Sequence, residues 1–371
     1  MRELAVLVDA TSVPPNRGGV ARYISGLLAG LAEHGARVDV VAKRGDVAWL
    51  EELAPGHRYH AAPRWTDARP LRLVWEQLGL PALLRRTGAT ILHSPHYTFP
   101  VIRASRTVVT LHDATFFSDP AAHSRLKVVF FRTWTRLARR AARATIAPSA
   151  ATVAEIERFD VPARTPTVVA HLGVDPQAFR PPTPDETASF RTAHGIPVDG
   201  DWVAFLGTVE PRKQVPALIA AHRGLPGAPP LLVAGGLGWD EDARRVLDAV
   251  GDRPGAPLRY LGYLPFDELH AFLGGARAVV YPSIAEGFGL PVLEAMASGG
   301  DVLTTRRLAI PEVGGDTVTY TEPTVEGIRQ ALGAMLADAP EDRADRTARA
   351  RRRAATFTWA ACAERHLEVY A

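Results

Sequence analysis

The stretch YPSIAEGFGLPVLEAMASGG, residues 281–300, contains the end of a strand, a glycine-bearing loop and the start of a helix. The loop spans residues 282–290, and Pro291 suits the first helical residue, where a missing N–H costs nothing. Loop amides and the positive end of the helix dipole favour an anion such as phosphate, and the loop glycines let the backbone approach it closely. Glu286 and Glu294 add acceptors for hydroxyl groups. Composition alone leaves open a purely structural role for this stretch, in which Glu294 caps its helix or faces solvent and the glycines only allow the chain to turn.

Short apolar runs alternate with helical patterns on both sides of this stretch. The runs predict strands at residues 4–8, 38–42, 90–93, 107–111, 144–147 and 167–170, and again at 202–206, 231–234, 258–261, 278–281, 302–305 and 318–320. Apolar strands separated by helices are typical of parallel sheets covered on both faces. We therefore predict an α/β protein built from two Rossmann-like, doubly wound domains.

The length of 371 residues also favours two domains. The Pro-rich segment 181–200 is predicted to be the linker between an N-terminal domain, residues 1–180, and a C-terminal domain, residues 201–355. Open α/β sheets bind ligands at the carboxyl ends of their strands. Two such domains facing each other would place their ligand-binding edges across one cleft.

The composition excludes several classes of protein. Hydrophobic residues make up 47% and charged residues 22%, a balance that is not that of a disordered chain. The single cysteine, Cys362, excludes an internal disulfide and a Cys-based metal cluster. No signal peptide or apolar run of about 20 residues is apparent, so we expect a cytoplasmic location. A net charge of +3 gives no reason to expect a nucleic-acid partner.

Two further loops follow predicted strands. In FLGTVEPRKQ, residues 205–214, Arg212 and Lys213 are placed to neutralise a diphosphate, although a basic pair also suits an ordinary helix start. In RGGVARY, residues 17–23, Gly18 and Gly19 open a helix as a phosphate-binding loop does. The second stretch matches neither the dinucleotide nor the Walker pattern, so a tight turn is an equal alternative.

Two histidines follow predicted strands of the N-terminal domain, His93 in LHSPHY and His112 in TLHDATFF. Either can hydrogen-bond a substrate hydroxyl, but a lone histidine at a strand end is more often structural. Their spacing shows no metal-ligand pattern, so we predict no metal site.

Together these segments resemble the family 4 glycosyltransferases, which are retaining enzymes of the two-domain GT-B fold. The family signature of two glutamates separated by seven residues is met by Glu286 and Glu294. The resemblance extends along nearly the whole chain, in the expected order, through LHSPHY, TLHDATFF, IAPSAAT, HLGVD, GTVEPRK, LVAGGLGW and PEVGGD.

The resemblance implies a role for each matching residue. Glu294 would bind ribose hydroxyls, Glu286 would touch the transferred sugar, and Lys213 would contact the diphosphate with Arg212 as a helper. The loop residues that would supply backbone donors are Gly287, Phe288, Gly289 and Leu290. In the N-terminal domain, Gly18 and Gly19 match a loop that closes on the donor, and His112 matches a position near the transferred sugar.

The resemblance also implies a mechanism and substrates. Transfer would occur on the front face through an oxocarbenium-like transition state, without a protein nucleophile, cofactor or metal, so the two glutamates are not the acid and nucleophile of a retaining glycosidase. Relatives that contain the sequence motifs WEQLGLP, HSPHY and EPRK are often mannosyltransferases of polysaccharide assembly. We therefore expect GDP-mannose as donor and a glycan or lipid-linked acceptor. The final helix, within residues 356–371, would cross back to the N-terminal domain.

The chain departs from the family pattern at Thr208, where an arginine is frequent, at Asp301, where a proline is common, and at Leu308, where a small or polar residue is usual. We expect Asp301 to lie beside the donor loops and to affect donor choice or binding. These departures keep a non-catalytic sugar-nucleotide-binding protein as an alternative. A phosphorylase or an epimerase of the same fold is another.

One helix, predicted over residues 124–143, is unusually basic. Its arginines are expected along one face: Arg132, Arg136, Arg139, Arg140 and Arg143. Such a face suits solvent, which we favour, or an anionic membrane surface that holds a lipid-linked acceptor at the inner face of the membrane.

Overall fold

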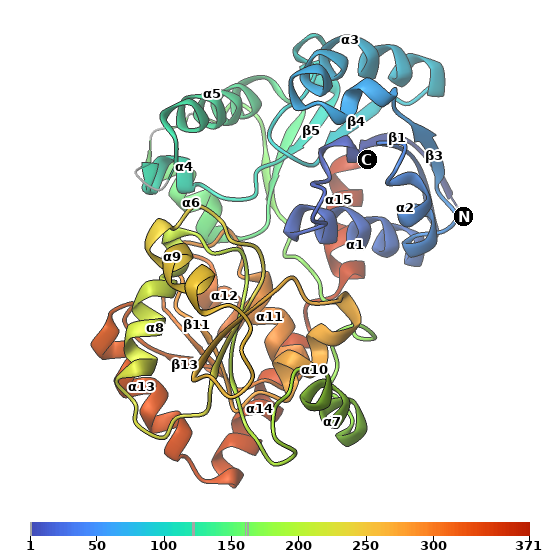
Figure 1. Cartoon of the computed structure of the whole chain (residues 1–371). Coiled ribbons are helices and arrows are strands. Elements are labelled where there is room, and N and C mark those ends of the chain that lie inside the picture. The colour runs from blue at the N-terminus through green and yellow to red at the C-terminus, as the bar shows by residue number, and fades with distance from the viewer. Residues whose placement is uncertain (1, 121–122, 160, 162) are drawn as a thin grey trace. The chain divides into compact units, whose positions relative to one another are not determined.

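The computed structural model describes residues 2–120, 123–159, 161 and 163–371. The chain forms two compact units (Figure 1). The first comprises Met1–Gly173 and Phe357–Ala371, and the second comprises Val174–Thr356. Among the described residues, no helix has both the length and the apolar character needed to cross a bilayer.

The first unit is built on a seven-stranded parallel sheet in the order β3-β2-β1-β4-β5-β6-β7. Its strands are β1 (Arg2–Asp9), β2 (Ala36–Ala42), β3 (Arg58–Ala61), β4 (Ile91–Ser94), β5 (Thr107–Thr110), β6 (Ala144–Ala147) and β7 (Thr167–Val169). Its helices are α1 (Gly19–Glu33), α2 (Val47–Leu53), α3 (Arg69–Thr87), α4 (Thr115–Ser118), α5 (Arg125–Ala141), α6 (Ala150–Arg158) and α15 (Trp359–Tyr370), with short 3₁₀ turns η1 (Ala10–Ser12), η2 (Arg64–Asp67) and η3 (Val101–Arg106).

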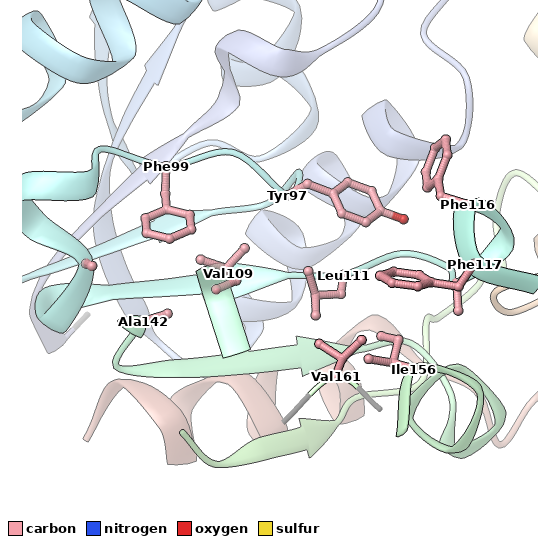
Figure 2. Packing of buried hydrophobic residues seen from close by; sticks show 12 residues of the cluster. Tyr97, Phe99, Val109, Leu111, Phe116, Phe117, Ala142, Ile156 and Val161 are labelled. Carbon is pink, nitrogen blue, oxygen red and sulfur yellow. The ribbon is translucent and has the colours of Figure 1, made fainter. Parts of the chain in front are cut away.

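A cluster of buried aromatic and aliphatic side chains packs against strands of this sheet (Figure 2). Phe99, Val109 and Leu111 are fully buried, and Phe116 stacks on Phe131 of α5 at a ring separation of 4.1 Å. Side chains of this size dominate the energetics of a core. The cluster fixes α4 and α5 against the strands whose carboxyl ends carry the histidines.

The second unit has a six-stranded parallel sheet in the order β10-β9-β8-β11-β12-β13. Its strands are β8 (Val203–Leu206), β9 (Leu231–Ala234), β10 (Leu258–Gly262), β11 (Ala278–Tyr281), β12 (Val302–Thr304) and β13 (Thr319–Tyr320). Its helices are α7 (Pro184–Ala193), α8 (Val215–Arg223), α9 (Glu241–Val250), α10 (Leu269–Gly274), α11 (Leu290–Ala297), α12 (Ile310–Gly314), α13 (Val325–Ala337) and α14 (Pro340–Ala354), with 3₁₀ turns η5 (Pro211–Lys213) and η6 (Phe266–Glu268).

The last helix, α15, packs against the first helix, α1, within the first unit. A Cβ added to Gly26 of α1 would lie 2.1 Å from the Trp359 ring, so only glycine allows this approach. The Tyr23 hydroxyl lies 2.7 Å from His366 Nε2, and the Tyr370 hydroxyl lies 2.7 Å from His93 Nδ1. These buried groups satisfy one another, as buried polar groups must.

The fold class predicted from sequence is confirmed, since both sheets are parallel and doubly wound. The predicted linker is wrong. Residues 184–193 form α7, which begins with a capping box at Thr183 and Glu186 and packs against α10 of the second unit. The edge strand β3, with the sequence RYHA, was missed because it has no apolar run.

Candidate active site

The predicted donor residues of the second unit follow the two strands at its topological switch point. In the order β10-β9-β8-β11-β12-β13, the chain reverses direction across the sheet between β8 and β11. Arg212 and Lys213 lie on η5 after β8, and Glu286 lies in the loop after β11. Open α/β sheets bind their ligands at this point.

The structure brings these three charged side chains into contact. Glu286 Oε1 accepts hydrogen bonds from Arg212 Nη1 at 2.5 Å and from Lys213 Nζ at 2.7 Å. The same oxygen accepts from the Tyr281 hydroxyl at 2.9 Å and from Ser283 Oγ at 2.7 Å. By contrast, Glu286 Oε2 accepts no hydrogen bond from any described residue. One carboxylate oxygen is therefore anchored, and the other is available to a ligand.

The buried charges perturb one another. Burial lowers the pKa of Lys213 to about 8, with a further lowering from the neighbouring Arg212 guanidinium and a partial opposition from Glu286. Burial acts to raise the pKa of Glu286, but Arg212 and Lys213 outweigh it and hold this pKa below its usual value. The Lys213 ammonium also lies 4.3 Å from the centre of the Tyr281 ring, a cation–π contact. Glu210 also pairs with Arg212 Nε at 2.8 Å, so the two cations are matched by two carboxylates.

The loop after Glu286 leads directly into α11. Gly289 caps this helix with φ of +99°, in the left-handed region that favours glycine. Pro291 is the second helical residue, one position later than predicted. Phe288 and Leu290 are buried beside the loop, and Glu294 is 1% exposed on α11. The loop therefore presents its backbone and a helix N-terminus at the carboxyl edge of β11, beside the two cations.

Close backbone packing explains the glycines that follow β9. A Cβ on Gly235 would lie 2.3 Å from the Gly207 carbonyl oxygen, and one on Gly238 would lie 2.2 Å from that of Val209. The loops after β8 and β9 can touch only because both residues are glycine. Thr208 lies within this packed pair of loops, at the position where an arginine is frequent in the family. Arg212 and Lys213 are the cations that contact the Glu286 carboxylate.

The predicted residues of the first unit lie at the carboxyl edge of its own sheet. Gly18 caps α1, and a Cβ added to Gly19 would meet no atom within 4 Å. Packing therefore does not require glycine at position 19, and the space above it is open. His112, after β5, is partly exposed, and its Nε2 donates to the Pro95 carbonyl at 2.6 Å. Burial lowers the pKa of His112, so its Nδ1 is an unprotonated acceptor at neutral pH.

His93 has a structural role, which the sequence left as the alternative to substrate binding. It is fully buried, its Nε2 lies 2.9 Å from Thr110 Oγ1, and its Nδ1 meets the Tyr370 hydroxyl. Burial lowers its pKa far below the usual value, so the ring is neutral. His93 holds α15 in place through Tyr370, and its burial keeps it from contacting a substrate.

The expectation for Asp301 is wrong. Asp301 precedes β12 and therefore lies at the amino end of that strand, whereas the donor loops follow the carboxyl ends. It is buried in a bidentate ion pair with Arg346 of α14, whose Nε and Nη2 donate to the two Asp301 oxygens at 2.8 and 2.7 Å. Arg346 also donates to Asp338. Leu308, in contrast, lies on the loop after β12 with φ of +47°, a strained conformation for a branched side chain.

Sequence reasoning missed the residues that hold Glu286 in place. The sequence pattern marks Tyr281 and Ser283 only as a strand end and a loop residue, yet each donates to the Glu286 carboxylate. Glu210 was missed as well, and its Oε2 accepts from Arg212 Nε at 2.8 Å. The available signal was the position of two hydroxyl residues directly after a buried strand and before a carboxylate.

The prediction that the arginines of α5 form one exposed basic face is also wrong in part. Arg139 is 1% exposed, and its guanidinium donates to the Val161 carbonyl and to Thr167 Oγ1. Arg132 donates to the Phe116 carbonyl at 2.7 Å. These two arginines bind the protein itself, whereas Arg136 and Arg140 are exposed.

Comparisons with known proteins agree with this architecture. The model of glycosyltransferase family 4 matches residues 17–178, and that of glycosyl transferases group 1 matches residues 186–353. O-antigen chain mannosyltransferase B of Escherichia coli is 32% identical over 287 residues, which are 76% of this chain and 74% of that protein.

Solved structures share the fold at low sequence identity. Sucrose-phosphate synthase of Thermosynechococcus elongatus superposes with a TM-score of 0.77 at 19% identity, covering 100% of this chain and 98% of that one. The structure of Anabaena HepE in complex with UDP and glucose superposes with a TM-score of 0.75 at 18% identity, covering 99% of each chain. With the two family models in chain order and a curated relative matched over three quarters of its length, the chain belongs to glycosyltransferase family 4.

Proposed function

We propose that the protein transfers a hexose, with retention of anomeric configuration, from a nucleotide-diphosphate sugar to a hydroxyl of a glycan or lipid-linked acceptor. The observation that carries this proposal is the anchored carboxylate of Glu286. Arg212 and Lys213 hold one of its oxygens, and none of the described residues donates a hydrogen bond to the other. Two cations beside a carboxylate acceptor suit a ligand that joins a diphosphate to a sugar.

The residues of the second unit are assigned as follows. Arg212 and Lys213 stabilise the negative charge that develops on the departing diphosphate, as preorganised cations do in group transfer. Glu286 Oε2 accepts a hydroxyl of the transferred sugar, and Glu294 accepts those of the ribose. Residues 287–290 supply backbone N–H groups. On the first unit, Gly18, Gly19 and His112 are assigned to the donor loop and to the transferred sugar.

The proposed reaction breaks the bond between the sugar C1 and the diphosphate oxygen, and the bonding electrons leave with the diphosphate. The acceptor oxygen bonds to C1 on the same face, and its proton passes to the departing diphosphate. No protein group forms a bond to the sugar. Arg212 and Lys213 supply the positive charge, and for this reason we propose that the reaction needs no metal.

We propose GDP-mannose as the donor, because O-antigen chain mannosyltransferase B of Escherichia coli is similar over most of the chain. The HepE structure contains UDP and glucose, which makes a UDP-sugar the competing donor. Thermal-shift screening with GDP-, UDP-, ADP- and dTDP-sugars separates them, since a ligand stabilises the folded state according to its concentration over its dissociation constant.

Transfer assays in EDTA test the reaction and the site. We expect donor-dependent transfer in EDTA, and a loss of at least about a hundredfold in Lys213→Ala and in Glu294→Ala. Unchanged turnover in both variants would refute the site. Phosphate-dependent release of sugar would indicate a phosphorylase, and conversion of the donor without acceptor would indicate an epimerase. Tight nucleotide binding without turnover over a broad acceptor panel would favour a non-catalytic protein.

A further inference from the structure

The loop after β4 contains a strained turn of the backbone. Tyr97, in the motif LHSPHY, has φ of +54°, in the left-handed region that bulky side chains rarely adopt. The Thr98 amide donates to the His96 carbonyl at 2.5 Å, which closes a three-residue γ-turn centred on Tyr97. Tyr97 is buried, and its ring lies in the cluster of Figure 2. Strained residues persist only where the surrounding structure holds them, and they gather at functional sites.

Side chains of α3 hold this turn in place. Glu76 is fully buried, and its Oε2 accepts from Thr98 Oγ1 at 2.6 Å. The next residue, Gln77, accepts from the Val101 amide at 3.0 Å. A buried carboxylate is costly unless it is hydrogen-bonded, so Glu76 opposes any movement of Thr98. The motif WEQLGLP, residues 75–81, therefore supports the conformation of the motif LHSPHY.

The turn holds His112, which follows the neighbouring strand β5. The Tyr97 hydroxyl donates to the Asp113 carbonyl at 3.0 Å and accepts from the Asp113 amide at 2.9 Å. Burial raises the pKa of Tyr97 far above its usual value, so the hydroxyl keeps the proton that it donates. The Pro95 carbonyl accepts from His112 Nε2 at 2.6 Å. The loop after β4 thus contacts both the His112 ring and the backbone that follows it.

Aromatic rings confine the His112 side chain further. The Tyr23 ring lies edge-on to it, with centroids 5.1 Å apart and ring planes at 84°. The His96 ring lies on another side, with centroids 5.8 Å apart. In a neutral imidazole, the hydrogen bond made by one nitrogen decides which nitrogen carries the proton. Because Nε2 donates to Pro95, Nδ1 is the acceptor.

We propose that Tyr97 is a positioning residue for His112, and that the strained turn selects the tautomer with the proton on Nε2. Its hydroxyl fixes the Asp113 backbone, while Glu76 and Thr98 keep the turn closed. The inference rests on the proposed function at one point, the assignment of His112 to the transferred sugar. With that assignment, the sugar donates a hydroxyl proton to Nδ1, and a shifted or reversed ring would fail to accept it.

NMR of the full chain with isotope-labelled histidine tests the proposal, because ring nitrogen signals distinguish the two neutral tautomers. The His112 signals are those lost in His112→Gln. We expect the tautomer with the proton on Nε2 in the unaltered chain and a mixture of both in Tyr97→Phe, which keeps the ring and loses both hydrogen bonds to Asp113. Thr98→Val separates the turn from Glu76 and should produce the same change.

Turnover of GDP-mannose provides a second measurement. In Tyr97→Phe we expect kcat to fall at least about tenfold, because a small misplacement of a positioned group slows the chemical step. KM should stay within about twofold, since the cations assigned to the diphosphate are unchanged. A loss of folded protein alone would lower the rate without changing the His112 tautomer.

Tyr59→Phe on β3 is the matched control. Its hydroxyl also donates to the backbone, to the carbonyls of Leu50 and Ala54 at 3.1 and 2.7 Å. Both tyrosine variants should lose roughly 2 to 4 °C in thermal midpoint, but Tyr59→Phe should leave the His112 tautomer and kcat unchanged.

Two results separate this proposal from the proposed function. His112 signals in Tyr97→Phe and Thr98→Val that match those of the unaltered chain would overturn the positioning role. So would a mixture of tautomers in the unaltered chain. A changed tautomer with unaltered kcat would support the positioning of His112 by Tyr97 and would refute the assignment of His112 to the transferred sugar.

Discussion

The proposed role of Glu286 gives one side chain two tasks that compete. In the structure Glu286 pairs with Arg212 and Lys213, which are the cations assigned to the diphosphate, and Glu210 also pairs with Arg212. The second Glu286 oxygen is proposed to accept a sugar hydroxyl. A bound diphosphate must therefore share these cations with a carboxylate or displace it. The site in the absence of ligand is already compensated, which avoids two uncompensated buried charges.

Glu286→Gln should separate the two tasks. We expect GDP and UDP to bind this variant about tenfold more tightly, or on the order of 1.4 kcal/mol, because the competing negative charge is gone. Turnover should fall about a hundredfold, because the amide is a weaker acceptor for the sugar. Titration calorimetry and initial rates measure the two effects.

Tyr281→Phe is the matched control for that experiment. It removes one hydrogen bond to Glu286 Oε1 and leaves every charge in place. We expect nucleoside diphosphate affinity to stay within about twofold, since a neutral hydrogen bond is worth about 1 kcal/mol and no cation is released. If Glu286→Gln and Tyr281→Phe shift the affinity equally, charge competition is not the cause.

The pH dependence of nucleotide binding should follow Lys213. Its pKa of about 8 means that the ammonium is charged below pH 8 and loses its proton as the pH rises through that value. A diphosphate binds the charged form, so the dissociation constant should be flat below pH 8 and rise with a slope approaching tenfold per pH unit above it. Calorimetry between pH 6.5 and 9.5, roughly spanning this pKa, detects the change.

Lys213→Arg provides the reference curve, because arginine stays charged throughout this range. Its dissociation constant should remain flat, even if the absolute affinity is lower. A rise above pH 8 in both proteins would assign the titration to another group.

At the scale of elements, the switch-point loops were predictable and their supporting contacts were not. Arg212, Lys213 and Glu286 could be placed because apolar strands are visible in the sequence and loops at strand ends bind ligands. The anchoring by Tyr281 and Ser283 depends on rotamers and on distances across a loop, which no spacing rule gives. The edge strand β3 and helix α7 were missed because one lacks an apolar run and the other begins with prolines.

Asp301 belongs to the contact between β12 and α14. Asp301→Asn should lower the free energy of unfolding by about 3 kcal/mol, because it leaves Arg346 without its buried two-pronged partner. Nucleotide affinity should not change, since Asp301 lies at the opposite end of the strand from the donor loops. Urea unfolding and calorimetry measure the two quantities.

The control for this change is Asp345→Asn on the same helix. Asp345 pairs with Arg349, and both side chains are largely exposed, so the loss should stay within about 0.5 kcal/mol. A change in nucleotide affinity in Asp301→Asn alone would restore the expectation drawn from the family resemblance.

At the scale of the whole molecule, the chain leaves the first unit at Gly173 and re-enters it at Phe357. The two-domain plan could be predicted from the repeated alternation of strands and helices. The exact points of exit and return could not, because they depend on contacts between residues far apart in sequence, such as Tyr23 with His366.

Gly26→Ala tests how closely the first and last helices are packed. Alanine normally stabilises a helix interior by about 1 kcal/mol relative to glycine. Here the added methyl group would lie 2.1 Å from the Trp359 ring, so we expect a destabilisation of about 2 kcal/mol. Thermal unfolding of Gly19→Ala, where the added group meets no atom within 4 Å, should show no such loss. A stabilised Gly26→Ala would refute the close packing.

The return of α15 to the first unit has a consequence for biosynthesis. Roughly 180 residues separate Gly173 from Phe357, so a ribosome needs about 10 to 40 seconds between them. During that time the nascent first unit lacks His366 and Tyr370, which are the α15 partners of Tyr23 and His93, and its Gly26 surface is uncovered. The second unit acquires its last segment, ending at Thr356, before α15 emerges. The unit that is encoded first is therefore completed last.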